Sequence, residues 1–280
     1  MKNQLKTALG ALAILLMFSG CQKDRNEAPR DPLDENYKLI DKGDYGQAIQ
    51  KLQELAVQDP RPQVKVALAS AYAARGGIRV EQYWGFVVGF KAPLVPAESL
   101  KMTGTAESLQ KIAKQAKGDI DPRDMKALGG LVNTLAVWDR YKDRVDSIPV
   151  VQGQALVDLK IAVDTLSMVQ TPGGRLYRAI LNLILFKSYV TASAQFWTDF
   201  NKAIEDVIAG RIEVLCRFDF EVLLKWLTPI SYHLSETMTD LSIAYPEDSE
   251  ELLDARAVVQ AVYATTLDAV TELRKKRTCQ

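Results

Sequence analysis

The chain has 280 residues, of which 48% are hydrophobic and 25% are charged, and its 35 basic residues equal its 35 acidic ones. This composition is typical of a globular protein and excludes a disordered, collagen-like or multi-span membrane chain. Nucleic-acid binding requires an excess of Lys and Arg, so a net charge of zero leads us to expect no nucleic-acid partner.

Residues 1–20 have the pattern of a secretory signal peptide. Lys2 and Lys6 supply positive charge ahead of the apolar stretch 8–18. That stretch is shorter than the roughly 20 residues that a membrane-spanning helix needs. The pattern therefore predicts a leader that is removed. An uncleaved anchor, or a secretory signal without lipid attachment, is the alternative.

The leader ends in Phe18-Ser19-Gly20-Cys21, which resembles the lipobox of bacterial lipoproteins, with Phe18 at the position where Leu is usual. The resemblance implies cleavage after Gly20 and attachment of diacylglycerol, carrying fatty acids such as palmitate, to Cys21. Gln22 follows where a retention signal would have Asp. By the sorting rule of Gram-negative lipoproteins, this implies a protein anchored on the periplasmic side of the outer membrane.

Beyond the cysteine, the sequence predicts a flexible lipid-anchored tether over residues 21–36 and an all-α domain over 37–280. The tether is polar and contains two prolines. In the domain, apolar residues recur every three or four positions, and no Asn-Gly or Asp-Gly hairpin turn occurs. The expected helices cover 45–58, 63–75, 105–117, 122–143, 151–169, 175–190, 192–209, 211–227, 229–243 and 249–276.

Residues 33–77 resemble a tetratricopeptide repeat (TPR), a helix-turn-helix unit that stacks on its neighbours into an α-solenoid. The usual Trp and Gly of the first helix are missing from 33–37. After residue 77 the repeats are degenerate, with one echo of the pattern. An unrelated αα-hairpin that follows the same packing rules is the alternative. The matching residues are Gly43, Asp44, Tyr45, Ala48, Leu52, Leu55, Pro60 and 68–72, and those of the echo are Ala162, Val163, Leu166, Val169 and Pro172.

The segment that follows Gly173-Gly174 is apolar nearly all round, which predicts a buried central helix. Its thin polar stripe consists of Arg175, Arg178, Asn182 and Lys187.

Residues 78–104 interrupt the helical pattern with glycines and prolines, and they concentrate aromatic side chains. One interpretation is a loop whose aromatic residues close the end of the helical core. The other is an apolar binding lip for a ligand, a partner helix or the membrane interface. The residues of this candidate lip are Tyr83, Trp84, Phe86 and Phe90.

The sequence offers little chemistry for catalysis or for binding a metal. His233 is its one histidine, and no Gly-x-Ser-x-Gly or Cys-x-x-Cys motif accompanies it. We therefore expect no enzyme activity, no cofactor and no metal. Once Cys21 carries lipid, two cysteines remain, Cys216 and Cys279. Either they form a disulfide, or Cys216 is a buried free thiol.

These observations predict a lipid-anchored scaffold or adaptor that binds an envelope protein on its helical repeats. The alternative is a helical lipoprotein that binds a small apolar molecule, similar to the T component of tripartite ATP-independent periplasmic transporters. An envelope hydrolase ranks last because only His233 favours it. In general plan, the chain is also similar to the repeat lipoprotein of the outer-membrane β-barrel assembly complex.

Overall fold

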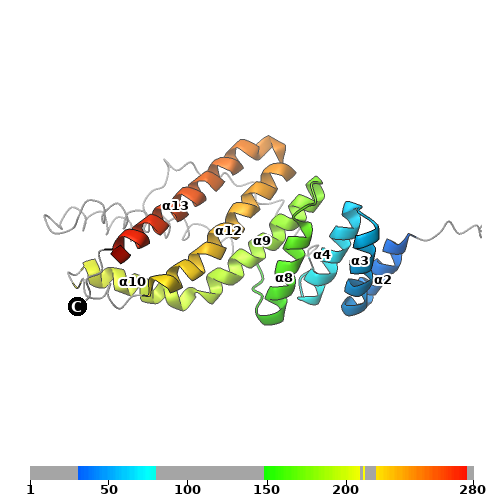
Figure 1. Ribbon diagram of the computed structural model, residues 1–280, viewed down its shortest axis with the longest axis horizontal. Helices are drawn as coiled ribbons and strands as arrows, with labels where there is room; N and C mark the ends of the chain where they lie inside the picture. The colour runs from blue at the N-terminus through cyan, green and yellow to red at the C-terminus, as the bar shows by residue number, and fades with distance from the viewer. Residues whose placement is uncertain (1–30, 80–147, 209–210, 212–218, 276–280) are drawn as a thin grey trace, which may run out of the picture. The chain divides into compact units, whose positions relative to one another are not determined.

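The computed structural model describes residues 31–79, 148–208, 211 and 219–275, and every regular element in them is a helix (Figure 1). The predicted all-α fold is therefore confirmed for this part of the chain. Its elements are α2 (Pro32–Lys42), α3 (Tyr45–Gln58), α4 (Pro62–Arg75), α8 (Gly153–Leu166), α9 (Pro172–Ala192), α10 (Ala194–Ile208), α12 (Phe220–Ala244), the 3₁₀ turn η3 (Pro246–Asp248) and α13 (Ser249–Lys275).

Local signals fix the bounds of α3 and α4. After α3 ends at Gln58, α4 starts at Pro62, where proline costs no hydrogen bond because the first N–H groups of a helix have no internal acceptor. Beyond the end of α4, Gly77 adopts a φ of +82°, a left-handed conformation that glycine takes without strain. The predicted helices 45–58 and 63–75 are thus confirmed.

Helices α3, α4, α8, α9, α12 and α13 each pack against the next one in that order (Figure 1). The contact between α9 and α12 is the most extensive, and α10 touches α9. The interhelical layers are filled by large apolar side chains that water does not reach, and burial of each stabilises the fold by about 1.5–3 kcal/mol. They include Leu52, Val64, Leu159, Leu166, Leu181, Ile184, Leu185, Phe186, Leu223 and Met238.

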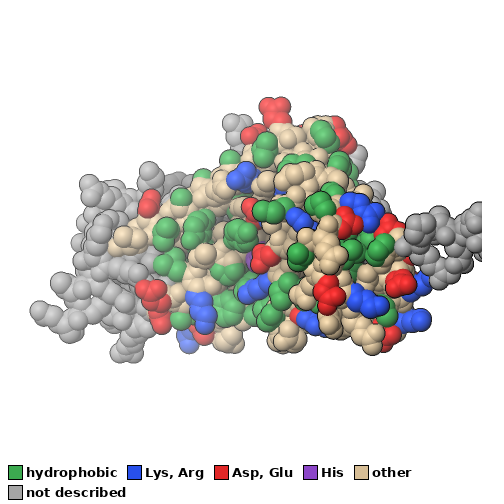
Figure 2. All heavy atoms as spheres, turned by 45° about the vertical axis from the view of Figure 1, so that its right-hand side comes forward, with side chains coloured by type: hydrophobic (Ala, Val, Ile, Leu, Met, Phe, Trp, Pro, Cys, Tyr) green, Lys and Arg blue, Asp and Glu red, His purple; other side chains and the backbone are tan. Residues whose placement is uncertain are grey.

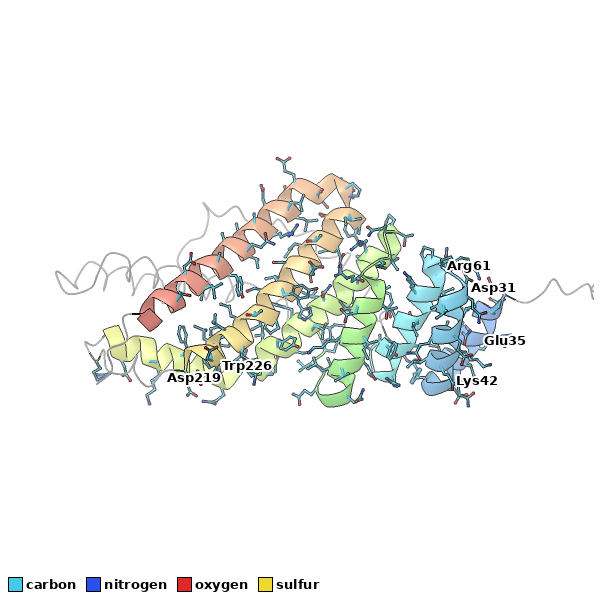
Figure 3. The ribbon with its side chains drawn as sticks, in the orientation of Figure 1. Asp31, Glu35, Lys42, Arg61, Asp219 and Trp226 are labelled. Atoms are coloured by element: carbon cyan, nitrogen blue, oxygen red, sulfur yellow. The ribbon has the colours of Figure 1, made fainter. Side chains whose placement is uncertain are left out.

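Helix α12 corrects the sequence prediction. The sequence predicts two helices here, over 211–227 and 229–243. The structure instead has one helix, Phe220–Ala244, with Pro229 inside it. The residue that precedes this helix, Asp219, is labelled in Figure 3. Asp219 caps it, because its Oδ1 accepts from the backbone N–H groups of Glu221 at 2.9 Å and Val222 at 3.4 Å. Packing of α12 against both α9 and α13 offsets the bond that proline removes.

The other predicted helices differ less from the structure. The segment expected at 151–169 is helical over Gly153–Leu166, and the one expected at 249–276 begins at Ser249. Residues 105–117 and 122–143 lie outside the described residues. The prediction that α9 is a buried central helix is confirmed, because it packs against both α8 and α12 and most of its side chains are buried.

Candidate functional site

Most of the site residues proposed from the sequence lie outside the described part of the chain. This applies to the signal cleavage site at Gly20, the lipidation site at Cys21 and the candidate disulfide between Cys216 and Cys279. It applies equally to the candidate binding lip of Tyr83, Trp84, Phe86 and Phe90. These assignments remain predictions, and the structure places only His233.

His233 lies on α12 with its side chain buried against α9. Its ring stacks on that of Tyr189, with centroids 5.6 Å apart, and meets the ring of Tyr232 edge-on at 5.1 Å. Its Nδ1 is 2.9 Å from Oδ1 of Asn182. An amide oxygen can only accept, so Nδ1 carries the proton in this arrangement. The imidazole is thereby held by packing on two sides and by a hydrogen bond on a third.

Burial, together with the positive charges of Lys160 and Arg178, lowers the pKa of His233 to about 4. The imidazole is therefore neutral at pH 7. Its orienting partner is a neutral amide rather than the carboxylate that would stabilise an imidazolium. The described contacts of His233 are those of a packed residue of the helix interface.

Several charged and amide side chains between α9 and α12 form one hydrogen-bond network. Nη1 of Arg175 donates to Oδ1 of Asp240 at 2.9 Å, and Nη1 of Arg178 donates to the same oxygen at 3.0 Å. Nη2 of Arg178 also donates to Oε2 of Glu236 at 2.6 Å. The long contact from Nδ2 of Asn182 to Oδ2 of Asp240, at 3.5 Å, links the histidine to this network. The α9–α12 polar cluster, as we call it, comprises Arg175, Arg178, Asn182, His233, Glu236 and Asp240.

The cluster places two cations opposite two anions in a region of low water access. Asp240 is fully buried, and Arg175 and Arg178 are each less than a tenth exposed. Burial raises the pKa of Asp240, and the hydrogen bond from Arg175 and the charge of Arg178 offset part of that rise. Removing one member would leave an opposite charge buried without compensation, which is costly. The cluster therefore favours one alignment of α9 with α12, since a shift by one turn would separate the pairs.

The polar residues of this cluster have the same spacing on α9 and on α12, and this match is visible only when the two helices are compared. The three α9 members occupy positions i, i+3 and i+7, as do the three α12 members. This is the spacing of one helix face. The sequence assigns Arg175, Arg178 and Asn182 to a polar stripe, whereas the structure buries all three against the matching row of α12. The two rows have the same spacing and carry opposite charges, so they are complementary when α9 and α12 pair.

On the face that Figure 2 shows, acidic and basic side chains of the described residues are interspersed among apolar ones, and neither charge dominates. Within the described residues, no cluster of three His, Cys, Asp or Glu side chains is placed to hold a metal. None of the helices in this part of the chain has both the length and the apolar character needed to cross a bilayer. Comparison with protein families, with curated proteins and with solved structures finds no match to this chain.

Proposed function

We propose that the protein is a lipid-anchored adaptor on the periplasmic side of the outer membrane, which binds an envelope protein on a TPR-like stack of helices. One observation carries the proposal: α3, α4, α8, α9, α12 and α13 pack one on the next in that order, and α10 touches α9 beside this stack. Repeat scaffolds are built in this way, because each unit buries its apolar face against its neighbours and leaves an extended surface for a partner.

The burial of α3 and α8 supports the repeat interpretation. In α3, Ala48 and Leu52 have no exposed area, and the same holds for the corresponding Ala162 and Leu166 of α8. A small residue at the first position lets a neighbouring helix approach closely, and a large one at the second fills the layer. The same pattern serves the same packing role in two helices far apart in the chain.

Exposed apolar side chains at three separate places in the stack are candidate contact positions for the partner. Val57 at the end of α3 is 87% exposed, Met168 after α8 is 75% exposed and Tyr232 of α12 is 51% exposed. Single exposed apolar residues are common on any surface. The proposal is therefore tested at these positions by experiment.

Site-specific photo-crosslinking in cells tests partner binding. A photoreactive amino acid at Val57, Met168 or Tyr232 should give a discrete adduct of one mass at one or more of the three positions. The same probe at the exposed polar residues Glu250 and Asp254 of α13 is the matched control. Adducts of equal yield at the control positions, or none at any position, would contradict the adaptor.

Membrane anchoring is tested separately with Cys21→Ala. The substitution should abolish incorporation of labelled palmitate and move the protein from the membrane fraction to the soluble fraction. If fractionation and labelling do not change, the lipoprotein assignment is wrong.

Native mass spectrometry of the purified protein separates the two candidate functions. A retained mass of a few hundred daltons, together with absence of crosslinks, would favour the small apolar ligand over the protein partner.

A further inference from the structure

The connection between α4 and α8 differs in length from the others in the described stack. Two residues join α2 to α3, three join α3 to α4, five join α8 to α9 and four join α12 to α13. The 27 residues between α9 and α12 include α10, whereas 77 residues separate α4 from α8. Connections between neighbouring helices commonly have two to eight residues. By length alone, α4 and α8 would not be expected to form one hairpin.

Despite this separation, α4 and α8 pack directly against each other. Both carboxylate oxygens of Asp158 accept from Arg75, at 2.7 and 2.8 Å. Gly76 lies so close to α8 that a Cβ on it would be 3.3 Å from the carbonyl oxygen of Ala155 and 3.5 Å from its Cα. The end of α4 and the first turns of α8 are therefore in contact along the backbone, as in a hairpin with a short loop.

The chain is also fixed on both sides of the long connection. After α4, the N–H of Ile78 donates to the carbonyl of Ala73 at 2.9 Å, and the Ile78 side chain is buried. Before α8, the N–H of Val151 donates to Oγ of Ser188 on α9 at 3.0 Å, and Ile148 and Val151 are buried. Each flank is held by the helical body itself.

We infer that residues 80–147 are an insertion into the loop of a single αα-hairpin, and that α4 and α8 form this hairpin without them. The inference rests on the contacts of α4 and α8 and is independent of the proposed adaptor function. The entropic cost of closing a flexible loop rises only with the logarithm of its length, so a hairpin can carry a long insertion. Whatever activity residues 80–147 have is then separable from the folding of the helices.

Cleavage of the full chain within the connection tests the inference. A specific protease recognition sequence is placed between residues 118 and 119, and the protein is cut under native, reducing conditions. We expect the two fragments to elute together in gel filtration, because α4 on one binds α8 on the other, and to separate only in denaturant. Fragments that separate on cutting, while the uncut protein is folded, would overturn the inference.

A shortened chain gives a second test that does not depend on protease access. Ten Gly/Ser residues replace 80–147, a linker that spans up to about 33 Å. In this chain and in the full one, Arg75→Ala, Asp158→Ala and the double variant are compared by thermal unfolding. We expect the same coupling between the two side chains, within about 2 °C in Tm. A shortened chain that folds without this coupling, or that does not fold, would show that α4 and α8 need the segment to pair.

Discussion

The guanidinium of Arg75 on α4 binds the carboxylate of Asp158 on α8 through two parallel hydrogen bonds, from Nε at 2.8 Å and from Nη2 at 2.7 Å. Gln154, one turn earlier on α8, donates to the same carboxylate at 2.9 Å, and the Arg75 guanidinium lies 5.2 Å from the centre of the Tyr72 ring. Bidentate pairs of this kind are stronger and more directional than single contacts. This pair therefore aligns two helices that the sequence separates by 77 residues.

Arg75→Ala should lower the free energy of unfolding by about 1.5 kcal/mol, because it leaves the buried Asp158 with Gln154 as its remaining side-chain donor. The side chain of Arg75 is 38% exposed, so water screens part of the interaction. Urea unfolding followed by circular dichroism measures the loss. The control is Arg61→Ala, which removes the exposed pair with Asp59 at the turn between α3 and α4 (Figure 3). Equal effects of the two substitutions would contradict the structural role of Arg75.

His233 should titrate with a pKa of about 4 in the folded protein, because burial disfavours the charged imidazole. The chain has one histidine, so a single imidazole signal in proton–carbon NMR spectra reports this titration directly. A signal that titrates near pH 6.5 in the folded protein would show that the ring is solvated and not packed between Tyr189 and Tyr232.

The same shift predicts how stability depends on pH. The unfolded chain protonates His233 below about pH 6.5, whereas the folded protein does so only near pH 4. Its contribution is therefore complete above pH 6.5 and is lost as the pH falls from 6.5 to 4, by up to about 3 kcal/mol. The raised pKa of Asp240 acts in the opposite direction, since the folded state then binds the additional proton. The difference between wild type and His233→Gln at each pH isolates the histidine, and parallel curves would contradict the prediction.

Two adjacent glycines at the start of α9 should respond differently to the same substitution. A Cβ on Gly174 would lie 2.3 Å from Cγ1 of Val169, whereas a Cβ on Gly173 would have nothing within 4 Å. Gly174→Ala should therefore destabilise the protein by about 1–3 kcal/mol, and Gly173→Ala should be neutral or slightly stabilising. Adding Val169→Ala to Gly174→Ala should remove part of the clash. Thermal unfolding of the four proteins checks both statements.

Asp240→Ala should destabilise the protein by about 3–5 kcal/mol, because it leaves the cations of Arg175 and Arg178 buried without their shared acceptor. Glu236→Gln is the matched control. Its side chain is 24% exposed, so water compensates for the lost charge and the effect should be smaller. Replacing Arg175 and Arg178 by Met together with Asp240→Leu should recover most of the loss, since the three most deeply buried charges of the cluster are then absent. Glu236 loses its partner Arg178 in this variant, but its side chain is 24% exposed and water can solvate it. A triple variant as unstable as Asp240→Ala would show that the cluster acts through more than charge.

The parts of the fold that are predictable from the sequence are those set by short-range signals. Asp59-Pro60 follows the end of α3 and Gly76-Gly77 follows the end of α4. Proline disfavours a helical conformation in the residue before it, and glycine can adopt the left-handed conformation that ends a helix. Both effects are local and do not depend on tertiary contacts. The reach of such signals is a few residues. The predicted division between helices 211–227 and 229–243 is wrong, because α12 is continuous through Pro229 and packs against both α9 and α13.

The candidate site depends on long-range pairing and is only partly predictable. The sequence is compatible with a packed or a surface position for His233, and the structure shows it packed. Its partner Asn182 is 51 residues away, and Arg75 and Asp158 are 83 residues apart. Helical periodicity says which face a residue occupies, but not which other helix that face meets. For that reason Arg178 and Asp240 can be assigned to polar rows and not to each other.

Pro229 has a further consequence for α12. Because proline lacks an N–H, the carbonyl of Lys225 has no donor four residues ahead, and the side chain of Lys225 lies on the exposed side of the helix. Local unfolding of α12 should accordingly be confined to the turns before Pro229. Amide protons near Asp219 should therefore exchange with deuterium well before those around Met238.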